Sequence, residues 1–214
     1  MRQSSRPPAA PRADLIRPPV DLAEETLERE SVFEGRILHV HRDRVRLPGG
    51  GLAEREVADH PGAVAILPVT PAGRIVLVWQ FRQAARRALL EIPAGKLAPG
   101  EAAEACARRE LREETGYEAG RLTALGRLMP SPGFSGEWLT LFVAEDLTPG
   151  PARPDPDEVL AQVEATPEEL EDLLHRGRIE DLKTAAAFLW WRRGAWRSGE
   201  RAAAHGAGGP DIQP

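Results

Sequence analysis

Three glutamates near the middle of the chain have the spacing of side chains that bind a metal ion together. Glu110, Glu113 and Glu114 lie in the stretch "RRELREETG", and positions i, i+3 and i+4 share one face of an α-helix. Magnesium prefers oxygen ligands and usually bridges carboxylates to the phosphates of a substrate. A helix with this face is therefore a candidate device for holding metal ions during phosphate chemistry.

A solvated helix is the alternative interpretation of the same charges. Like charges at these spacings repel by roughly a few tenths of a kcal/mol per pair, and an arginine one turn away offsets part of that cost. Arg109 stands four residues before Glu113, and Arg108 and Arg112 flank the same glutamates. A surface helix of this kind needs no ion, but it does not explain the residues that precede it at fixed distances.

Those preceding residues complete a longer pattern. From Gly95 to Tyr117 the sequence reads G-x5-E-x7-R-E-L-x-E-E-x-G-Y. This pattern resembles the Nudix box, the signature of the Nudix hydrolases, at every fixed polar and glycine position. Tyr117 is a mild departure, because the family usually has a small aliphatic residue there. The resemblance implies the Nudix α/β/α sandwich and hydrolysis of a pyrophosphate bond in a nucleoside diphosphate derivative.

The resemblance also implies roles for residues of this loop and helix. Glu110 and Glu114 match metal ligands, Glu113 matches a ligand or a close neighbour of the ligands, and the backbone carbonyl of Ala94 matches a further ligand. Arg109 matches the residue that pairs with the glutamates and orients them. The implied cofactor is Mg²⁺, with Mn²⁺ as a substitute. Such ions neutralise a pyrophosphate, polarise phosphorus and lower the pKa of bound water.

Glu101 is expected to take a different part. The turn at Pro99-Gly100 predicts a helix that starts directly after it, with Glu101 in the first turn, and stops at Gly116. On such a helix Glu101 lies nine residues before Glu110, which is about 180° around the axis and roughly 13 Å along it. Glu101 should therefore face away from the metal ligands and act at the helix start instead.

Sequences on both sides of the box resemble the ADP-ribose pyrophosphatase branch of the family, over about residues 30–190. They are "VWQFRQAARRALLEIPAGKL" and "MPSPGFSGEWLTLFVAEDL". In that branch Arg82 matches an arginine that contacts the substrate diphosphate or ribose, and Glu137 matches a loop glutamate proposed as general base or late-recruited ligand. Glu91 matches either an acid behind the metal ligands or a residue that binds the distal ribose. Lys96 is a further candidate for substrate binding.

The N-terminal segment supplies the remaining candidates. Arg55 and Glu56 match residues that reach the adenine end across a swapped dimer interface, and Phe33 is a candidate for stacking on adenine. The implied reaction is hydrolysis of ADP-ribose to AMP and ribose 5-phosphate by a homodimer. Two alternatives stay open. One is the same chemistry on another nucleoside diphosphate sugar or related dinucleotide, and the other is a sensor that binds ADP-ribose without cutting it.

The elements that must position these residues form a mixed series. Segments 62–70 and 74–81 are short, apolar and β-branched, and they read as a hairpin from the centre of a sheet. Further strands are predicted within 30–47, 52–60, 88–95, 121–129, 137–147 and 158–165, and helices within 99–116, 167–177 and 182–196. This order favours an α/β sandwich on a mixed sheet with a small N-terminal β subdomain. In the last helix, the expected core contacts are Phe188, Leu189, Trp190 and Trp191.

Length and charge limit the remaining choices. A chain of 214 residues is long enough for one well-cored domain with a small accessory one, here predicted as 61–197 and 21–60, with disordered tails at 1–20 and 198–214. The net charge of −5 gives no general case for nucleic-acid binding, and no apolar run approaches the roughly 20 residues of a membrane span. The single cysteine, Cys106, fits a reducing compartment. The sequence thus favours a cytoplasmic protein.

Overall fold

A computed structural model describes residues 15, 17–154, 156 and 158–194. Most of the two predicted tails, 1–20 and 198–214, lies outside these described residues. The chain divides into two compact units, and the boundary falls between Ala58 and Asp59. No helix within the described ranges has the length and apolar character needed to cross a bilayer.

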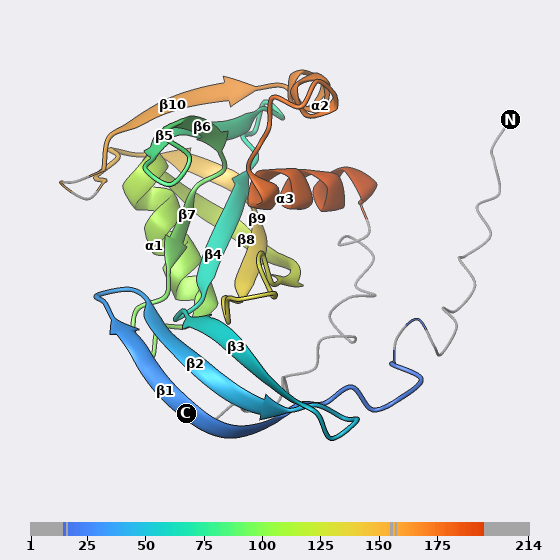
Figure 1. The fold of residues 1–214 in the computed structure, drawn as a ribbon. Helices are drawn as coiled ribbons and strands as arrows, with labels where there is room; N and C mark the ends of the chain where they lie inside the picture. The colour runs from blue at the N-terminus through green and yellow to red at the C-terminus, as the bar shows by residue number, and fades with distance from the viewer. Residues whose placement is uncertain (1–14, 16, 155, 157, 195–214) are drawn as a thin grey trace, which may run out of the picture. The chain divides into compact units, whose positions relative to one another are not determined.

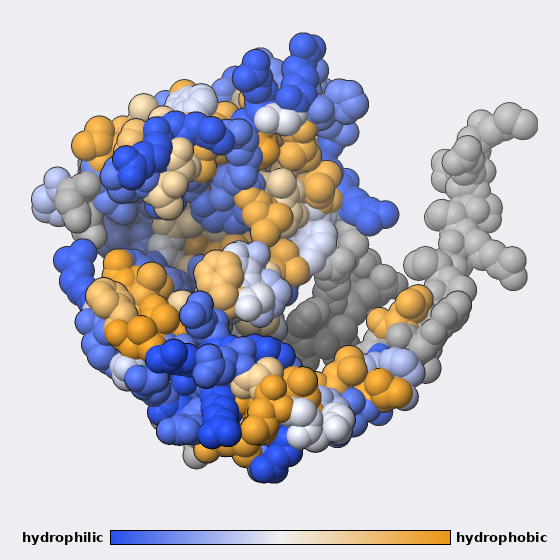
Figure 2. Space-filling view, viewed as in Figure 1, coloured by the Kyte–Doolittle hydropathy of each residue, from blue (hydrophilic) through white to orange (hydrophobic). Residues whose placement is uncertain are grey.

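The N-terminal unit is a three-stranded sheet in the order β1-β2-β3. Its strands are β1 (Glu25–Glu34), β2 (His39–Arg46) and β3 (Leu52–Asp59), and β1 pairs antiparallel with β2. Strands β2 and β3 confirm the strands predicted within 30–47 and 52–60, and β1 begins before this range, at Glu25. All ten residues of β1 are exposed, so this strand contributes nothing to a core of its own. Figure 2 shows hydrophilic and hydrophobic side chains interspersed over this unit.

The second unit contains two further sheets. One has the order β7-β4-β9-β8 and the other has the order β10-β5-β6. In the four-stranded sheet β4 and β9 run parallel while the other pairs are antiparallel, so the sheet is mixed as predicted. The strands are β4 (Ala63–Pro68), β5 (Ile75–Arg82), β6 (Arg87–Glu91), β7 (Ala94–Lys96), β8 (Tyr117–Leu128), β9 (Leu139–Pro149) and β10 (Leu160–Ala165).

Helices cover both faces of the four-stranded sheet, as Figure 1 shows for α1 (Ala103–Thr115) and α3 (Leu182–Arg193). Alternate residues of a strand point to opposite faces, and β4 is buried along its whole length. Val64 and Ile66 pack in one cluster with Leu111 of α1, whereas Leu67 belongs to a second cluster with Phe188 of α3. The fold is therefore the predicted α/β/α sandwich.

The predicted hairpin of segments 62–70 and 74–81 is wrong. Both segments are strands, but β4 lies in the four-stranded sheet and β5 in the three-stranded sheet with β10 and β6. Only an isolated bridge between Val69 and Ile75 joins them. An apolar run buried on both faces looks the same in sequence whether its neighbour in the sheet is adjacent in the chain or distant. Here the neighbour of β4 is the distant β9.

The C-terminal helices begin where the sequence places their caps. The Thr166 side chain accepts a hydrogen bond from the Glu169 backbone N–H at the start of α2 (Pro167–His175) and forms a reciprocal capping box with it. Asp181 caps α3 in a similar way by accepting from the Thr184 backbone N–H. One expected core contact is wrong, because Leu189 of α3 is 50% exposed.

Candidate active site

A glycine on β7 and a glutamate on α1 create the closest contact of the site. Gly95 lies beneath the Glu110 carboxylate, and a Cβ added to Gly95 would stand 1.8 Å from both Cδ and Oε1 of Glu110. A side chain at this position fits only if the Glu110 carboxylate moves aside. The Glu110 side chain is only 12% exposed. The spacing from the box glycine to the first helical glutamate therefore brings these two residues into direct contact.

Arg109 joins the acidic residues of the box. Its Nη1 donates to Glu110 Oε1 at 2.7 Å and to Glu113 Oε2 at 3.0 Å. Its Nη2 also donates to the backbone carbonyl of Lys96 at 3.3 Å, which ties the helix to β7. These are the contacts expected of a residue that orients the glutamates.

The structure corrects the expectation for Glu101. The helix begins at Ala103 rather than directly after Pro99-Gly100, so Glu101 lies before the helix and the helical angle does not apply to it. Its carboxylate accepts two hydrogen bonds from Arg109, from Nε and Nη2, both at 3.0 Å. It also accepts from the Ala98 backbone N–H. The pKa of Glu101 is lowered to about 2, mainly because Arg109 donates hydrogen bonds to its carboxylate. Glu101 thus anchors Arg109 beneath the other glutamates.

Glu114 is the most buried acid of the box. Its side chain lies almost wholly inside the protein, with 4% of the residue exposed. Burial, followed by the negative charges of Glu158 and Glu110, raises its pKa to about 8. A hydrogen bond from the Ala94 backbone and the charge of Arg82 oppose this rise. A buried carboxylate with acidic neighbours is stabilised in its charged form by a bound cation.

Glu158 is an acid that the sequence interpretation missed. The pKa of Glu110 is raised mainly by burial, and the negative charges of Glu113 and Glu158 raise it as well. Glu158 therefore acts on both Glu110 and Glu114, although it lies in the segment before β10. The signal for it is the acidic run "PDPDE", whose last residue, Glu158, begins the predicted strand 158–165.

These residues fit a hard divalent cation by their chemistry. The donors are carboxylate and backbone oxygens, which Mg²⁺ and Mn²⁺ prefer, and the repulsion between the carboxylates falls when a cation binds. Within the described ranges, no three His, Cys, Asp or Glu side chains are already arranged around a common metal position. Glu110 and Glu113 instead point to Arg109, so an ion must compete with this guanidinium for them.

Arg82 and Glu91 form a single unit at the ends of β5 and β6. Arg82 donates from Nε and Nη2 to the two carboxylate oxygens of Glu91, at 2.9 and 2.7 Å. Glu91 has a 2% exposed side chain, whereas Arg82 is 40% exposed. Glu114 is among the charges that raise the pKa of Arg82. The arginine therefore extends from a buried carboxylate toward the acids of the box.

Glu137 lies in the loop before β9, and Lys96 lies at the end of β7, where its backbone carbonyl accepts from Arg109. The Glu137 Oε1 atom lies 3.9 Å from Nδ1 of His60, and the Glu137 backbone N–H donates to Ser135. His60 also accepts from the Gly62 backbone N–H at 3.1 Å. Lys96 is exposed.

The three candidates in the N-terminal unit are all accessible. Phe33 on β1 is 57% exposed. Arg55 on β3 pairs with Glu24 through two hydrogen bonds, at 3.0 and 2.6 Å. Glu56 on the same strand is exposed. Their roles at an adenine end stay predictions.

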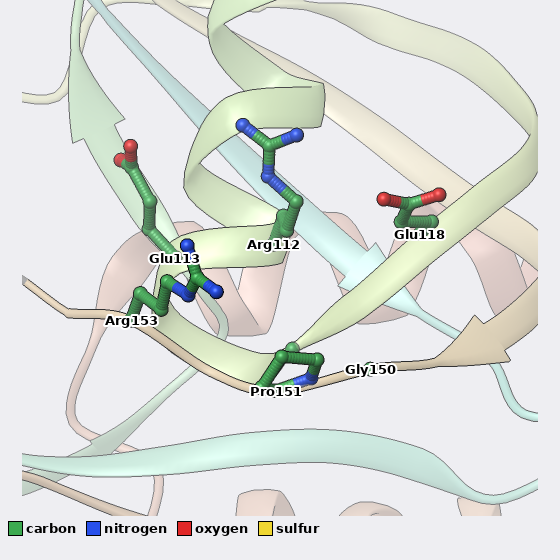
Figure 3. Close-up of a pocket in the computed structure, with 7 residues that line it drawn as sticks. Arg112, Glu113, Glu118, Gly150, Pro151 and Arg153 are labelled. Atoms are coloured by element: carbon green, nitrogen blue, oxygen red, sulfur yellow. The ribbon is translucent and has the colours of Figure 1, made fainter.

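A pocket of about 490 Å³ opens at the carboxyl end of α1. Figure 3 shows Glu113 and Arg153 on one side of it and Glu118 on the opposite side, with Arg112 between them. The floor is fixed, because the Arg153 backbone N–H donates to the Glu113 carbonyl at 2.9 Å. Gly116 has φ +75° and would place a Cβ 2.3 Å from the Gly150 carbonyl oxygen. The chain from Gly150 to Arg153 is thereby held against the end of the helix.

Comparisons with known proteins agree with this geometry. The NUDIX domain model matches residues 59–188, and the model of the nucleoside diphosphate sugar hydrolase N-terminal domain matches residues 24–58. An ADP-ribose pyrophosphatase of Bacillus subtilis is 42% identical over 79% of this chain and 92% of its own length. A methanol dehydrogenase activator of Bacillus methanolicus is 40% identical over 78% and 91%. A crystal structure of an ADP compounds hydrolase superposes with a TM-score of 0.73 at 25% identity and covers 84% of this chain and 98% of that one.

Proposed function

The chain belongs to the Nudix family of hydrolases, and from that premise we propose that it hydrolyses the pyrophosphate bond of ADP-ribose to give AMP and ribose 5-phosphate. The observation that carries the proposal is the complete acidic box on α1, with Glu110 seated on Gly95. An ADP-ribose pyrophosphatase that is 42% identical over most of the chain supports the choice of substrate. Other ADP compounds are the nearest alternative, because the similar crystal structure is that of an ADP compounds hydrolase.

Nudix hydrolases generally use a divalent metal ion, and we propose Mg²⁺ with Mn²⁺ as a substitute. Glu110 and Glu114, the carbonyl of Ala94 and, close by, Glu113 would hold it. The ion would neutralise the diphosphate charge and make phosphorus more electrophilic. Arg109 keeps Glu110 and Glu113 oriented through its two hydrogen bonds. The chain thus provides a site in which the charges of the acids and of the diphosphate are both balanced.

In the proposed mechanism, an arginine binds the diphosphate of the substrate. A glutamate acts as the base that activates the attacking water. Arg82 presents to the diphosphate the part of its guanidinium that does not contact Glu91. Glu137 is the sequence-based candidate for the base that takes a proton from the attacking water, and its loop can bring it close when substrate binds. Glu158 is a second candidate, because its charge already acts on Glu110 and Glu114.

A substrate panel tests the proposed function. With Mg²⁺ present, AMP release from ADP-ribose should exceed release of nucleotide from GDP-mannose, diadenosine polyphosphates, NADH and dNTPs by kcat/KM. The reason is that the sequences flanking the box, and not only the box, match ADP-ribose pyrophosphatases. Chromatography of the products measures each rate under one condition. Equal or better turnover of another compound in the panel contradicts the choice of ADP-ribose.

We also propose a homodimer in which the N-terminal unit contributes to the partner's substrate site. The unit exposes Leu27, Val32 and Phe33 on β1 and has no buried residue on that strand. Mass photometry at low concentration and sedimentation at micromolar concentration should both report twice the mass of one chain. A single-chain mass at micromolar concentration is the result that contradicts the dimer.

A further inference from the structure

Four charged side chains form a continuous line behind the proposed substrate arginine. Arg82 contacts Glu91 through two hydrogen bonds, and Lys183 of α3 donates to the same Glu91 through its ammonium group. Lys183 also donates to Asp181 Oδ1 at 2.9 Å. Exposure of the side chains falls from 40% at Arg82 to 13% at Lys183 and 2% at Glu91. Only one member of the line is therefore open to a ligand.

The inner end of this line is fixed to the fold. Asp181 caps α3 and accepts from the Thr184 backbone N–H at 2.9 Å. The Thr184 hydroxyl, which is fully buried, accepts from the Ile92 backbone N–H at 2.8 Å. Ile92 follows Glu91 directly in the chain. The first turn of α3 is thus attached to the strand end that holds Glu91, and Lys183 is part of that attachment.

Glu91 needs both cations. Burial alone raises the pKa of a carboxyl, yet the hydrogen bond from Arg82 and the charge of Lys183 together hold the pKa of Glu91 below its usual value. Two oxygens of a fully buried carboxylate are thereby matched by two positive groups. Loss of Lys183 leaves Arg82 as the only cation bonded to Glu91, so the guanidinium is drawn inward or the carboxylate becomes protonated.

One side of the Arg82 guanidinium is bonded to Glu91, and this fixes which side faces a ligand. Nε and Nη2 are hydrogen-bonded to Glu91, which leaves Nη1 for a ligand. A guanidinium held at two atoms has one orientation, and a planar donor group of fixed orientation suits a phosphate. The charge of Glu114 also raises the pKa of this guanidinium, which favours its charged form.

We propose that Lys183 is a positioning residue, which holds Glu91 charged and Arg82 directed at the substrate diphosphate without itself touching the substrate. This inference rests on the proposed function, in which Arg82 binds a diphosphate. Lys183 is distant from Arg82 in the chain and contributes only through Glu91. Its effect on catalysis must therefore depend on the presence of Arg82.

A double-mutant cycle tests that dependence. The probe is ADP-ribose with saturating Mg²⁺. Lys183→Met should raise KM about tenfold, as is typical when a group that orients a functional side chain is removed, with a smaller change in kcat because the binding contact and not the chemistry is weakened. In an Arg82→Ala background the same Lys183→Met substitution should change KM by less than about twofold, since coupled residues are not additive.

Arg192→Met is the matched control. Arg192 lies on the same helix and pairs with Glu171 at 2.7 Å on the surface, so the control removes an equal charge and a surface ion pair from α3. Its kinetic parameters should stay at wild-type values. If Lys183→Met melts more than about 10 °C below wild type by a thermal scan, a shift that exceeds the ordinary effect of a surface substitution, Lys183→Gln replaces it under the same criteria.

Three results would contradict the roles proposed for Lys183, for Arg82 and for the enzyme itself. An unchanged KM in Lys183→Met, or the same factor in both backgrounds, overturns the positioning role of Lys183. An unchanged KM in Arg82→Ala removes the role of Arg82 and, with it, the positioning of Arg82 by Lys183. Absence of ADP-ribose hydrolysis by the wild-type chain instead contradicts the proposed function itself.

Discussion

Replacing Glu114 with glutamine is expected to abolish most turnover of ADP-ribose while the protein stays folded. Removal of a residue that merely supports a metal ligand typically costs about 10–100-fold in activity, so loss of a ligand should lower kcat by at least about a hundredfold. Glutamine has nearly the shape of the buried carboxyl but lacks its charge. Steady-state kinetics at saturating Mg²⁺ measure the effect.

The fold should survive because the charge of Glu114 is a cost in the absence of an ion. The folded-state pKa is about 8, against an ordinary value of 4.5, so the folded protein binds a proton more tightly than the unfolded chain between these values. The stability contributed by that proton is complete below pH 4.5 and is lost as pH rises through about 8. In chelator above about pH 8, Glu114→Gln should therefore melt at or above the temperature of wild type.

Glu104→Gln is the control for this pair of measurements. Glu104 lies on the same helix and pairs with Arg108 at 2.9 Å on the surface. It should keep wild-type kcat and the wild-type response to Mg²⁺, whereas added Mg²⁺ should raise the melting temperature of wild type more than that of Glu114→Gln. A Glu114→Gln enzyme with kcat within twofold of wild type would show that Glu114 is not a metal ligand.

Gly95→Ala should have an effect of similar size by a steric route. The new Cβ would occupy the place of the Glu110 carboxylate, 1.8 Å from its Cδ and Oε1. The carboxylate is the end of a flexible side chain and can move aside, so the melting temperature should change little. Displacement of a catalytic group by about 1 Å can cost on the order of a hundredfold in rate, and kcat should fall by about that factor.

The control for the glycine is Gly49→Ala, which adds the same methyl group where nothing lies within 4 Å. Activity and melting temperature should both match wild type in that variant. Gly95→Ala should also bind Mg²⁺ more weakly in a titration, because Glu110 has moved. Full activity in Gly95→Ala is incompatible with a functional Glu110 at the observed position.

The local pattern of the sequence predicts more of the site than of the strand pairing. The i, i+4 spacing predicts the contact of Arg109 with Glu113, because one helical turn separates them. The contact of Arg109 with Glu110, its neighbour in the chain, follows from the family resemblance and not from spacing. The spacing does not predict the contact of Glu101, since the helix starts at Ala103 and not at the turn of Pro99-Gly100. Such a shift at a helix start decides whether a carboxylate lies on the helix or beside it.

Local sequence patterns do not predict contacts between residues that are distant in the chain. The β5–β6 register places Arg82 opposite Arg87 and Glu91 opposite Val78, so the Arg82–Glu91 pair does not follow from strand pairing. Lys183 joins Glu91 from 92 residues away. The charge of Glu158 reaches the box only because the segment after β9 rests on the end of α1. Periodicity likewise identifies β4 and β5 as strands but contains no information on which sheet each one enters.

Strand β1 also has a consequence for handling the protein. It stands at the end of its sheet, and a long, uncovered edge strand is a template for aggregation. Its apolar side chains Val32 and Phe33 are flanked by charged ones, which are Glu28, Arg29, Glu30 and Glu34. Electrostatic repulsion between these charges and those of a second chain disfavours the pairing of β1 with a strand of another molecule. Solubility of the N-terminal unit should therefore decline at high salt, where that repulsion is screened.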